Sequence, residues 1–185
     1  TVHQKRILEA EFVSMKHPKE FRTKYYDDGQ AYVYGKLNSF FIMRTGAGLI
    51  NVIAAKGNRS GVEIRYVGSA GFALGMTKPV YLYIIDAQAG SDPPPVRYDP
   101  DKHFPDNIEG QAEFGKGLSE TKFHPGAYGK FGFSFEYASF DKDIKSIETG
   151  IILDAFPKKI PIMAMTENQQ VFLSFYVSLV YGGKW

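Results

Sequence analysis

Charged side chains at alternating positions are the first candidates for chemistry in this sequence. Eight of them fall on the same parity as small and polar residues: Lys36, Arg44, Glu63, Arg65, Lys130, Glu136, Glu148 and Asp154. Because both signs are present, the set could form either a closed group of ion pairs inside the fold or the lining of an ion path. We expect the closed group of ion pairs.

Acid–base or nucleophilic catalysis has little support in the sequence. Glu148 and Asp154 share one face of an extended strand, but six residues at about 3.3 Å each separate them by about 20 Å, too far to act on one bond. The segment Gly68-Ser69-Ala70-Gly71 does not match the spacing of a nucleophile elbow. We therefore expect no catalytic residues and no enzymatic activity.

Metal ligation is equally unsupported. The four histidines, at positions 3, 17, 103 and 124, lack the spacing of a zinc site, and the chain has no cysteine. An acidic loop with Asp99, Asp101 and Asp106 lacks the glycine and the terminal glutamate of an ordered calcium loop. We predict neither a metal nor a cofactor.

Length and charge narrow the class of protein. The 185 residues suit one domain spanning 1–185, in which residues 1–30 form an N-terminal strand or a periplasmic segment. The net charge is +2 and the basic residues are scattered, so nucleic acid is not an expected partner. No charged and then apolar leader precedes Thr1, so an exported protein would have lost its signal peptide.

The residues above must be positioned by strands, because apolar residues alternate with small or polar ones throughout the chain. The C-terminal segment is the clearest: its apolar face carries Val171, Leu173, Phe175, Val177, Leu179 and Tyr181, and the same parity reaches Trp185. The same alternation occurs at 127–137, 147–155 and 62–74. Further strands are expected at Tyr32–Arg44 and Val80–Ile85.

Turns and loops separate these segments. Residues 56–61 and 140–143 are rich in Gly, Asn, Asp or Lys and predict short turns, whereas 86–107, which contains Pro93-Pro94-Pro95, predicts a long irregular loop. Six strands are then visible, and a small closed barrel needs an even number near eight. Ile7–Met15 and Gln111–Lys122 are the expected remaining two.

These patterns together favour an all-β fold, a small antiparallel up-and-down transmembrane β-barrel of eight strands. Charges fall on one parity and long apolar faces on the other, which is the pattern of strands with a polar lumen and a lipid-facing surface. Aromatic residues make up 15% of the chain, which suits aromatic girdles at two membrane interfaces. The long final strand with its terminal aromatic indicates a bacterial outer membrane.

Several segments resemble the small outer-membrane β-barrels of Bacteroidota. They include Gly61–Tyr66, Lys78–Tyr81, His124–Tyr128, Phe156–Ala164 and Tyr176–Trp185, of which Phe156-Pro-Lys-Lys-Ile-Pro-Ile-Met is the most specific. The similarity covers about residue 32 to the end. It implies an outer-membrane location and an accessory role in larger machines for protein insertion or secretion, with outer-membrane lipids and other outer-membrane proteins as partners. It implies no catalytic residues.

Four hypotheses of function follow. The leading one is a non-enzymatic structural or accessory subunit of an outer-membrane complex. The alternatives are a small pore or transporter for solutes, a lipid-modifying barrel enzyme, and a soluble lipocalin-type barrel with its apolar face inside. The Phe156–Met163 segment either docks on a neighbouring protein or folds back over the barrel mouth.

Overall fold

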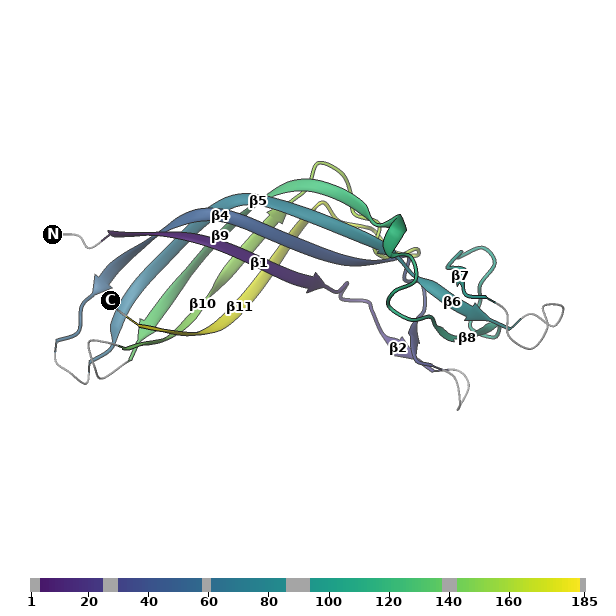
Figure 1. The fold of residues 1–185 in the computed structure, drawn as a ribbon, viewed down its shortest axis with the longest axis horizontal. Coiled ribbons are helices and arrows are strands. Elements are labelled where there is room, and N and C mark those ends of the chain that lie inside the picture. The colour runs from purple at the N-terminus through teal and green to yellow at the C-terminus, as the bar shows by residue number, and fades with distance from the viewer. Residues whose placement is uncertain (1–3, 25–29, 58–60, 86–93, 138–142, 184–185) are drawn as a thin grey trace.

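A computed structural model describes residues 4–24, 30–57, 61–85, 94–137 and 143–183. The molecule is elongated, with a curled sheet of long strands at one end and a smaller folded region at the other (Figure 1). Both described ends of the chain lie at the end of the sheet that is remote from the smaller region. The fold is all-β, and the described residues contain no α-helix.

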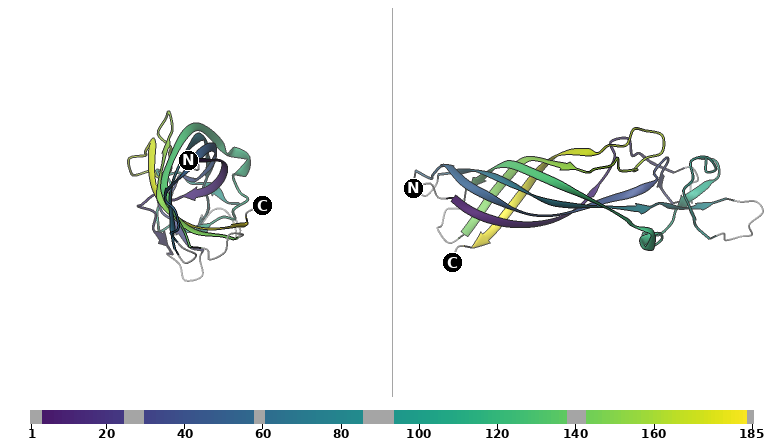
Figure 2. Two further views of the ribbon diagram at one scale, coloured as in Figure 1. Left: turned by 90° about the vertical axis from the view of Figure 1, so that its left-hand side faces the viewer. Right: turned by 90° about the horizontal axis from the view of Figure 1, so that it is seen from above.

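One antiparallel sheet of six long strands makes up most of the structure. Its strands follow one another in chain order: β1 (Gln4–Met15), β4 (Asn38–Ala54), β5 (Glu63–Pro79), β9 (Lys122–Glu136), β10 (Asp143–Ala155) and β11 (Val171–Gly183). The end-on view shows that the sheet curls into a half-barrel (Figure 2). Among the described residues β1 and β11 do not pair, so closure of an eight-strand barrel is not seen.

The alternation expected from the sequence is present on every long strand. On β9, Tyr128, Gly132, Ser134 and Glu136 are buried on the concave face, while Phe131 and Phe133 are exposed on the convex face. On β11, Phe172 is buried and Phe175 is 82% exposed. The register joins these faces into continuous surfaces, because Phe131 lies opposite Ile151, which lies opposite Phe175.

The long connections form a folded region that we call the cap. It contains a two-stranded sheet, β2 (Arg22–Thr23) with β3 (Tyr32–Val33). A three-stranded sheet joins β6 (Tyr81–Ile84) to β7 (Val96–Arg97) and β8 (Ile108–Gln111), and a 3-10 turn, η1, spans Leu118–Glu120. The cap has its own core: Tyr32, Val80, Leu82, Tyr98 and Ile108.

Strand assignment from sequence was right for Ile7–Met15, which lies within β1. It was wrong for Gln111–Lys122, where only the first and last residues belong to strands and Gly117 takes a φ of 80° that breaks an extended chain. Val80–Ile85 is extended but belongs to the cap instead of the barrel sheet. The segment Tyr32–Arg44 is not one strand, because Gly35 at φ 77° separates β3 from β4.

The remaining sequence predictions concern connections. The turns at 56–61 and 140–143 fall where consecutive long strands are joined, although 58–60 and 138–142 lie outside the described residues. The predicted long loop at 86–107 carries β7 and a hydrogen-bonded turn from Asp99 to His103 in its described part. Residues 86–93 and the terminal Trp185 lie outside the described residues.

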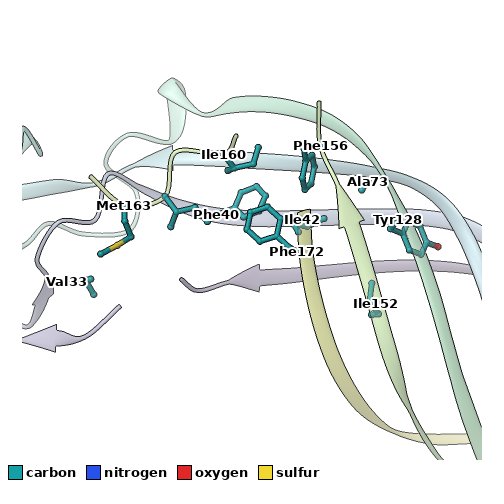
Figure 3. Packing of buried hydrophobic residues seen from close by; sticks show 11 residues of the cluster. Val33, Phe40, Ile42, Ala73, Tyr128, Ile152, Phe156, Ile160, Met163 and Phe172 are labelled. Carbon is teal, nitrogen blue, oxygen red and sulfur yellow. The ribbon is translucent and has the colours of Figure 1, made fainter. Parts of the chain in front are cut away.

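An apolar cluster fills the concave side of the sheet next to the cap. Phe40, Phe156 and Phe172 pack in edge or tilted contact, with centroids 5.3 to 6.0 Å apart (Figure 3). Ile160 and Ile162 are buried in the same cluster. The Phe156–Met163 segment therefore folds back over the mouth of the half-barrel, the second of the two alternatives expected for it. Leu37 and Asn38 donate backbone hydrogen bonds to the Ile162 carbonyl and hold it there.

Candidate functional site: the ionic network inside the half-barrel

A buried ion pair lies at the centre of the concave face. Arg44 projects from β4 and Asp154 from β10, and the guanidinium donates two hydrogen bonds of 2.7 Å, from Nε to Oδ1 and from Nη2 to Oδ2. Both side chains are almost fully buried. This bidentate geometry is the strongest form of an arginine–carboxylate contact. It joins two strands that are separated by β5 and β9 in the sheet.

Lys130 on β9 is the hub of the network. Its Nζ lies 2.8 Å from Glu11, 3.3 Å from Glu9 and 3.7 Å from Glu148. Glu11 also accepts a hydrogen bond of 3.1 Å from Arg44, so the hub and the buried pair are one connected network. One ammonium group thus lies against three carboxylates from two different strands.

Two tyrosines complete this network, and glycines make room for them. Tyr128 donates to Glu9 over 2.8 Å, and Tyr176 donates to Glu148 over 2.8 Å while its ring lies 4.7 Å from Lys130 Nζ. A Cβ at Gly132 would overlap the Tyr176 hydroxyl. These close contacts fill the inside of the half-barrel with side chains.

A second group of charges lies toward the end of the half-barrel that is remote from the cap. Arg65 forms ion pairs with Glu136 and with Glu63, the latter at 2.5 Å, and Lys56 lies 3.3 Å from Glu136. Glu136 and Arg65 are buried. The concave face therefore carries three layers along its length: the apolar cluster near the cap, the network around Lys130, and this group.

Seven of the eight charged residues that the sequence singled out lie on the concave side, four in the network around Lys130 and three in the group around Arg65. The exception is Lys36, which lies outside the sheet in the connection before β4 and pairs with Glu20 at 2.6 Å. Sequence reasoning missed Glu9 and Glu11, although their alternation with Leu8, Ala10 and Phe12 was the available signal. The sequence predicted that Glu148 and Asp154 lie too far apart to act on one bond. In the structure they meet different cations, Lys130 and Arg44 respectively.

The convex face is apolar and exposed on all six long strands. Its exposed side chains include Leu8, Phe12, Phe72, Phe131, Leu153, Leu173, Phe175 and Val177. Near the cap, Phe12 stacks on Phe41 at 5.9 Å and Phe41 meets Phe114 edge-on at 6.0 Å. Toward the other end, the ring centroid of Phe131 lies 5.5 Å from that of Phe133 and 6.4 Å from that of Tyr66.

Exposed phenylalanines stand toward both ends of the convex face of β9. Phe123, near the cap on β9, and Phe133 are ten residues apart. At about 3.3 Å per residue this is about 33 Å along the strand. Strands of membrane barrels tilt by about 35–45°, and at about 40° this length would span about 25 Å along the barrel axis.

The cap presents polar turns and isolated apolar side chains. Burial lowers the pKa of His103, with Lys102 acting in the same direction and Asp99 against it. Its Nδ1 accepts a hydrogen bond of 2.9 Å from the Asp99 amide. Burial is the main cause that raises the pKa of Tyr98, to about 12, and the neighbouring Tyr34 is the second. Phe104 and Leu118 are exposed on this region.

Other candidates for chemistry stay apart. Within the described parts of the chain, no group of three or more His, Cys, Asp or Glu residues could hold a metal ion. Asp99 caps a turn through the Asp101 amide at 3.1 Å, and His124 lies 2.9 Å from Thr77. Ser69 faces inward on β5 and donates a hydrogen bond to Glu9.

Comparison of the chain with protein-family models, curated proteins and solved structures finds no match in any of the three. Within the described residues, no helix has the length and apolar character needed to cross a membrane.

Proposed function

We propose that this protein is a non-enzymatic outer-membrane β-barrel that serves as a structural or accessory subunit of a larger outer-membrane complex. The observation that carries the proposal is the inverted distribution of polarity in the sheet. Arg44, Asp154 and Glu136 are buried inside, while the convex face exposes Phe131, Phe175 and their neighbours. In water such an apolar surface is unfavourable, whereas lipid requires it.

The connections support an orientation in that membrane. The long connections form the cap at one end, and the joins between β4 and β5 and between β9 and β10 are short. Outer-membrane barrels carry short turns on the periplasmic side and long loops outside. The cap is accordingly extracellular in this proposal, and both described chain ends are periplasmic.

The filled interior favours a structural role over a solute pore. The apolar cluster around Phe40 and Phe172 occupies the mouth, and the network around Lys130 occupies the middle. These side chains occupy the space in which a porin has its water-filled path, which argues against a pore. We expect a silent planar bilayer, and steady single-channel conductance would support the pore instead.

The accessory role is tested by gentle extraction and purification. The tagged protein, extracted in a mild detergent, is expected to migrate as part of a larger complex. Phe104→Glu or Val96→Glu, each on the exposed surface of the cap, is expected to dissociate that complex without unfolding the barrel. Lys102→Glu on the same region is the control. A protein that purifies alone as a monomer contradicts the accessory role.

The purified protein also distinguishes the hypothesis of a lipid-modifying enzyme from that of a structural subunit. The ionisable groups of the network contact one another: Lys130, Glu9, Glu11, Glu148 and Arg44 form one connected set. We expect no change in the mass of added lipid A or phospholipid during incubation with the protein. A mass change that is abolished by heat denaturation would contradict the non-enzymatic assignment.

A further inference from the structure

The half-barrel has a lateral opening between its two edge strands, β1 and β11. Each is paired on one side, β1 with β4 and β11 with β10, and the other side carries no ladder among the described residues. Unpaired backbone N–H and C=O groups cannot remain exposed in the hydrocarbon core of a bilayer. We call this opening the seam. A membrane-inserted form therefore needs the seam to be filled.

Strand direction limits what can fill the seam. The chain runs toward the cap in β1 and away from it in β11 (Figure 1). A single added strand would be antiparallel to one edge and parallel to the other, so an all-antiparallel closure takes an even number of strands. Of two added strands, the one beside β11 runs toward the cap and the one beside β1 runs away from it. One hairpin with its turn at the cap end meets this requirement.

Curvature keeps the number of added strands small, and a single hairpin of two is the smallest even addition. Arg44 on β4 reaches Asp154 on β10, and Lys130 on β9 reaches Glu9 on β1, so strands three apart in the sheet meet through one pair of side chains. An interior only as wide as its side chains is that of an eight-strand barrel, and the diameter grows with strand number. A twelve-strand barrel made of two copies would pull these pairs apart.

Charge defines the chemistry of the added strands. Six carboxylates on the concave side, those of Glu9, Glu11, Glu63, Glu136, Glu148 and Asp154, meet four cations, Arg44, Lys56, Arg65 and Lys130. Three of the six share Lys130: Glu9 and Glu11 lie on the edge strand β1, and Glu148 lies on β10, next to the edge strand β11. A cation entering from the seam would relieve the repulsion among them.

We propose that the seam binds a β-hairpin of two strands, apolar toward lipid and carrying one lysine or arginine inward against Glu9, Glu11 and Glu148. The inference rests on the proposed membrane location, because lipid is what requires the edges to be paired. Recognition is by strand addition: backbone hydrogen bonds supply affinity and the inward cation supplies selectivity.

The test uses designed hairpin peptides as probes. Each has two twelve-residue strands with alternating apolar residues and one inward position that is Lys, Gln or Glu. The protein is refolded into phosphatidylcholine vesicles with each labelled probe, and binding is read by fluorescence anisotropy and native mass spectrometry. We expect a 1:1 complex in which the Lys probe binds at least about tenfold more tightly than the Glu probe, as for a close charge pair. Glu148→Gln should reduce that preference, and Glu113→Gln in the cap should leave it unchanged.

Each other outcome overturns the inference. Equal affinity for the Lys and Glu probes removes the charge selectivity, and a species of twice the chain mass that takes up no probe makes a second copy the occupant. Because the chain has no cysteine, Ala10→Cys can be combined in turn with Val171→Cys, Phe175→Cys and Leu179→Cys. An intramolecular disulfide without probe shows direct closure of six strands. Vesicle flotation is scored separately, so a protein that inserts but shows no Lys preference leaves the membrane location standing.

Discussion

Arg44 and Asp154 face each other across the inside of the half-barrel through two hydrogen bonds of 2.7 Å. The pair is separated by 110 residues in the chain, and it fixes the distance between β4 and β10. This one contact therefore helps to hold the sheet in its curved form. The first prediction tests that role.

Arg44→Met is expected to lower the free energy of unfolding by about 3–5 kcal/mol, because the buried Asp154 carboxylate loses its partner. Arg44→Met combined with Asp154→Leu should recover most of the loss, since the buried carboxylate that lost its partner is removed as well. Urea unfolding in vesicles measures both. Lys102→Ala, which removes an exposed pair with Asp99 at 3.7 Å, is the control and should change stability by less than about 1 kcal/mol.

Substitution of the inward glycines tests the packing around the tyrosines. A Cβ at Gly132 would lie 2.6 Å from the Thr149 carbonyl oxygen and would overlap the Tyr176 hydroxyl. Gly132→Ala should therefore cost about 1–3 kcal/mol of unfolding free energy, as overpacking does. Gly129→Ala has open space around it on the same strand and serves as the matched control. Equal effects at the two positions would contradict the observed packing.

A charge on the convex face distinguishes lipid from water. Leu153 is 47% exposed and lies opposite Gly129, about midway between the aromatic groups on β9. Leu153→Lys should destabilise the vesicle-inserted protein by about 2–4 kcal/mol, because an amine in the apolar band loses its hydration. Met165→Lys, on an exposed cap residue, should have little effect. If Leu153→Lys is also harmless in vesicles, the convex face does not contact lipid.

The turn around His103 predicts a pH dependence in the cap. The folded pKa of His103 lies below its usual value, so the unfolded turn takes up the proton first as the pH falls. Stability is full above about pH 6.5 and declines as the pH drops below it. Protonated Nδ1 can no longer accept the Asp99 amide hydrogen bond. The protection factor of that amide, its observed exchange rate compared with the intrinsic rate at the same pH, should fall between pH 7 and pH 5, and His103→Gln should abolish the fall.

Much of the half-barrel could be predicted from the sequence because period-two alternation is a local property. The inward parity of Lys130, Glu136 and Glu148 follows directly from their apolar neighbours. The partners of these residues could not be predicted, since Lys130 meets Glu11 across 119 residues and only through the curl of the sheet. The same limit applies to Val80–Ile85. Its extended conformation follows from the local sequence, but the sheet it joins depends on pairing with β7 and β8, which are distant in the chain.

The location of the protein is tested most directly by expressing it with a signal peptide, separating the membranes, and comparing boiled with unboiled samples on gels. The proposal predicts protein in the outer-membrane fraction whose migration shifts on heating, because a folded β-barrel resists detergent until it is boiled. A soluble protein without a heat shift would contradict the assignment of the convex face to lipid.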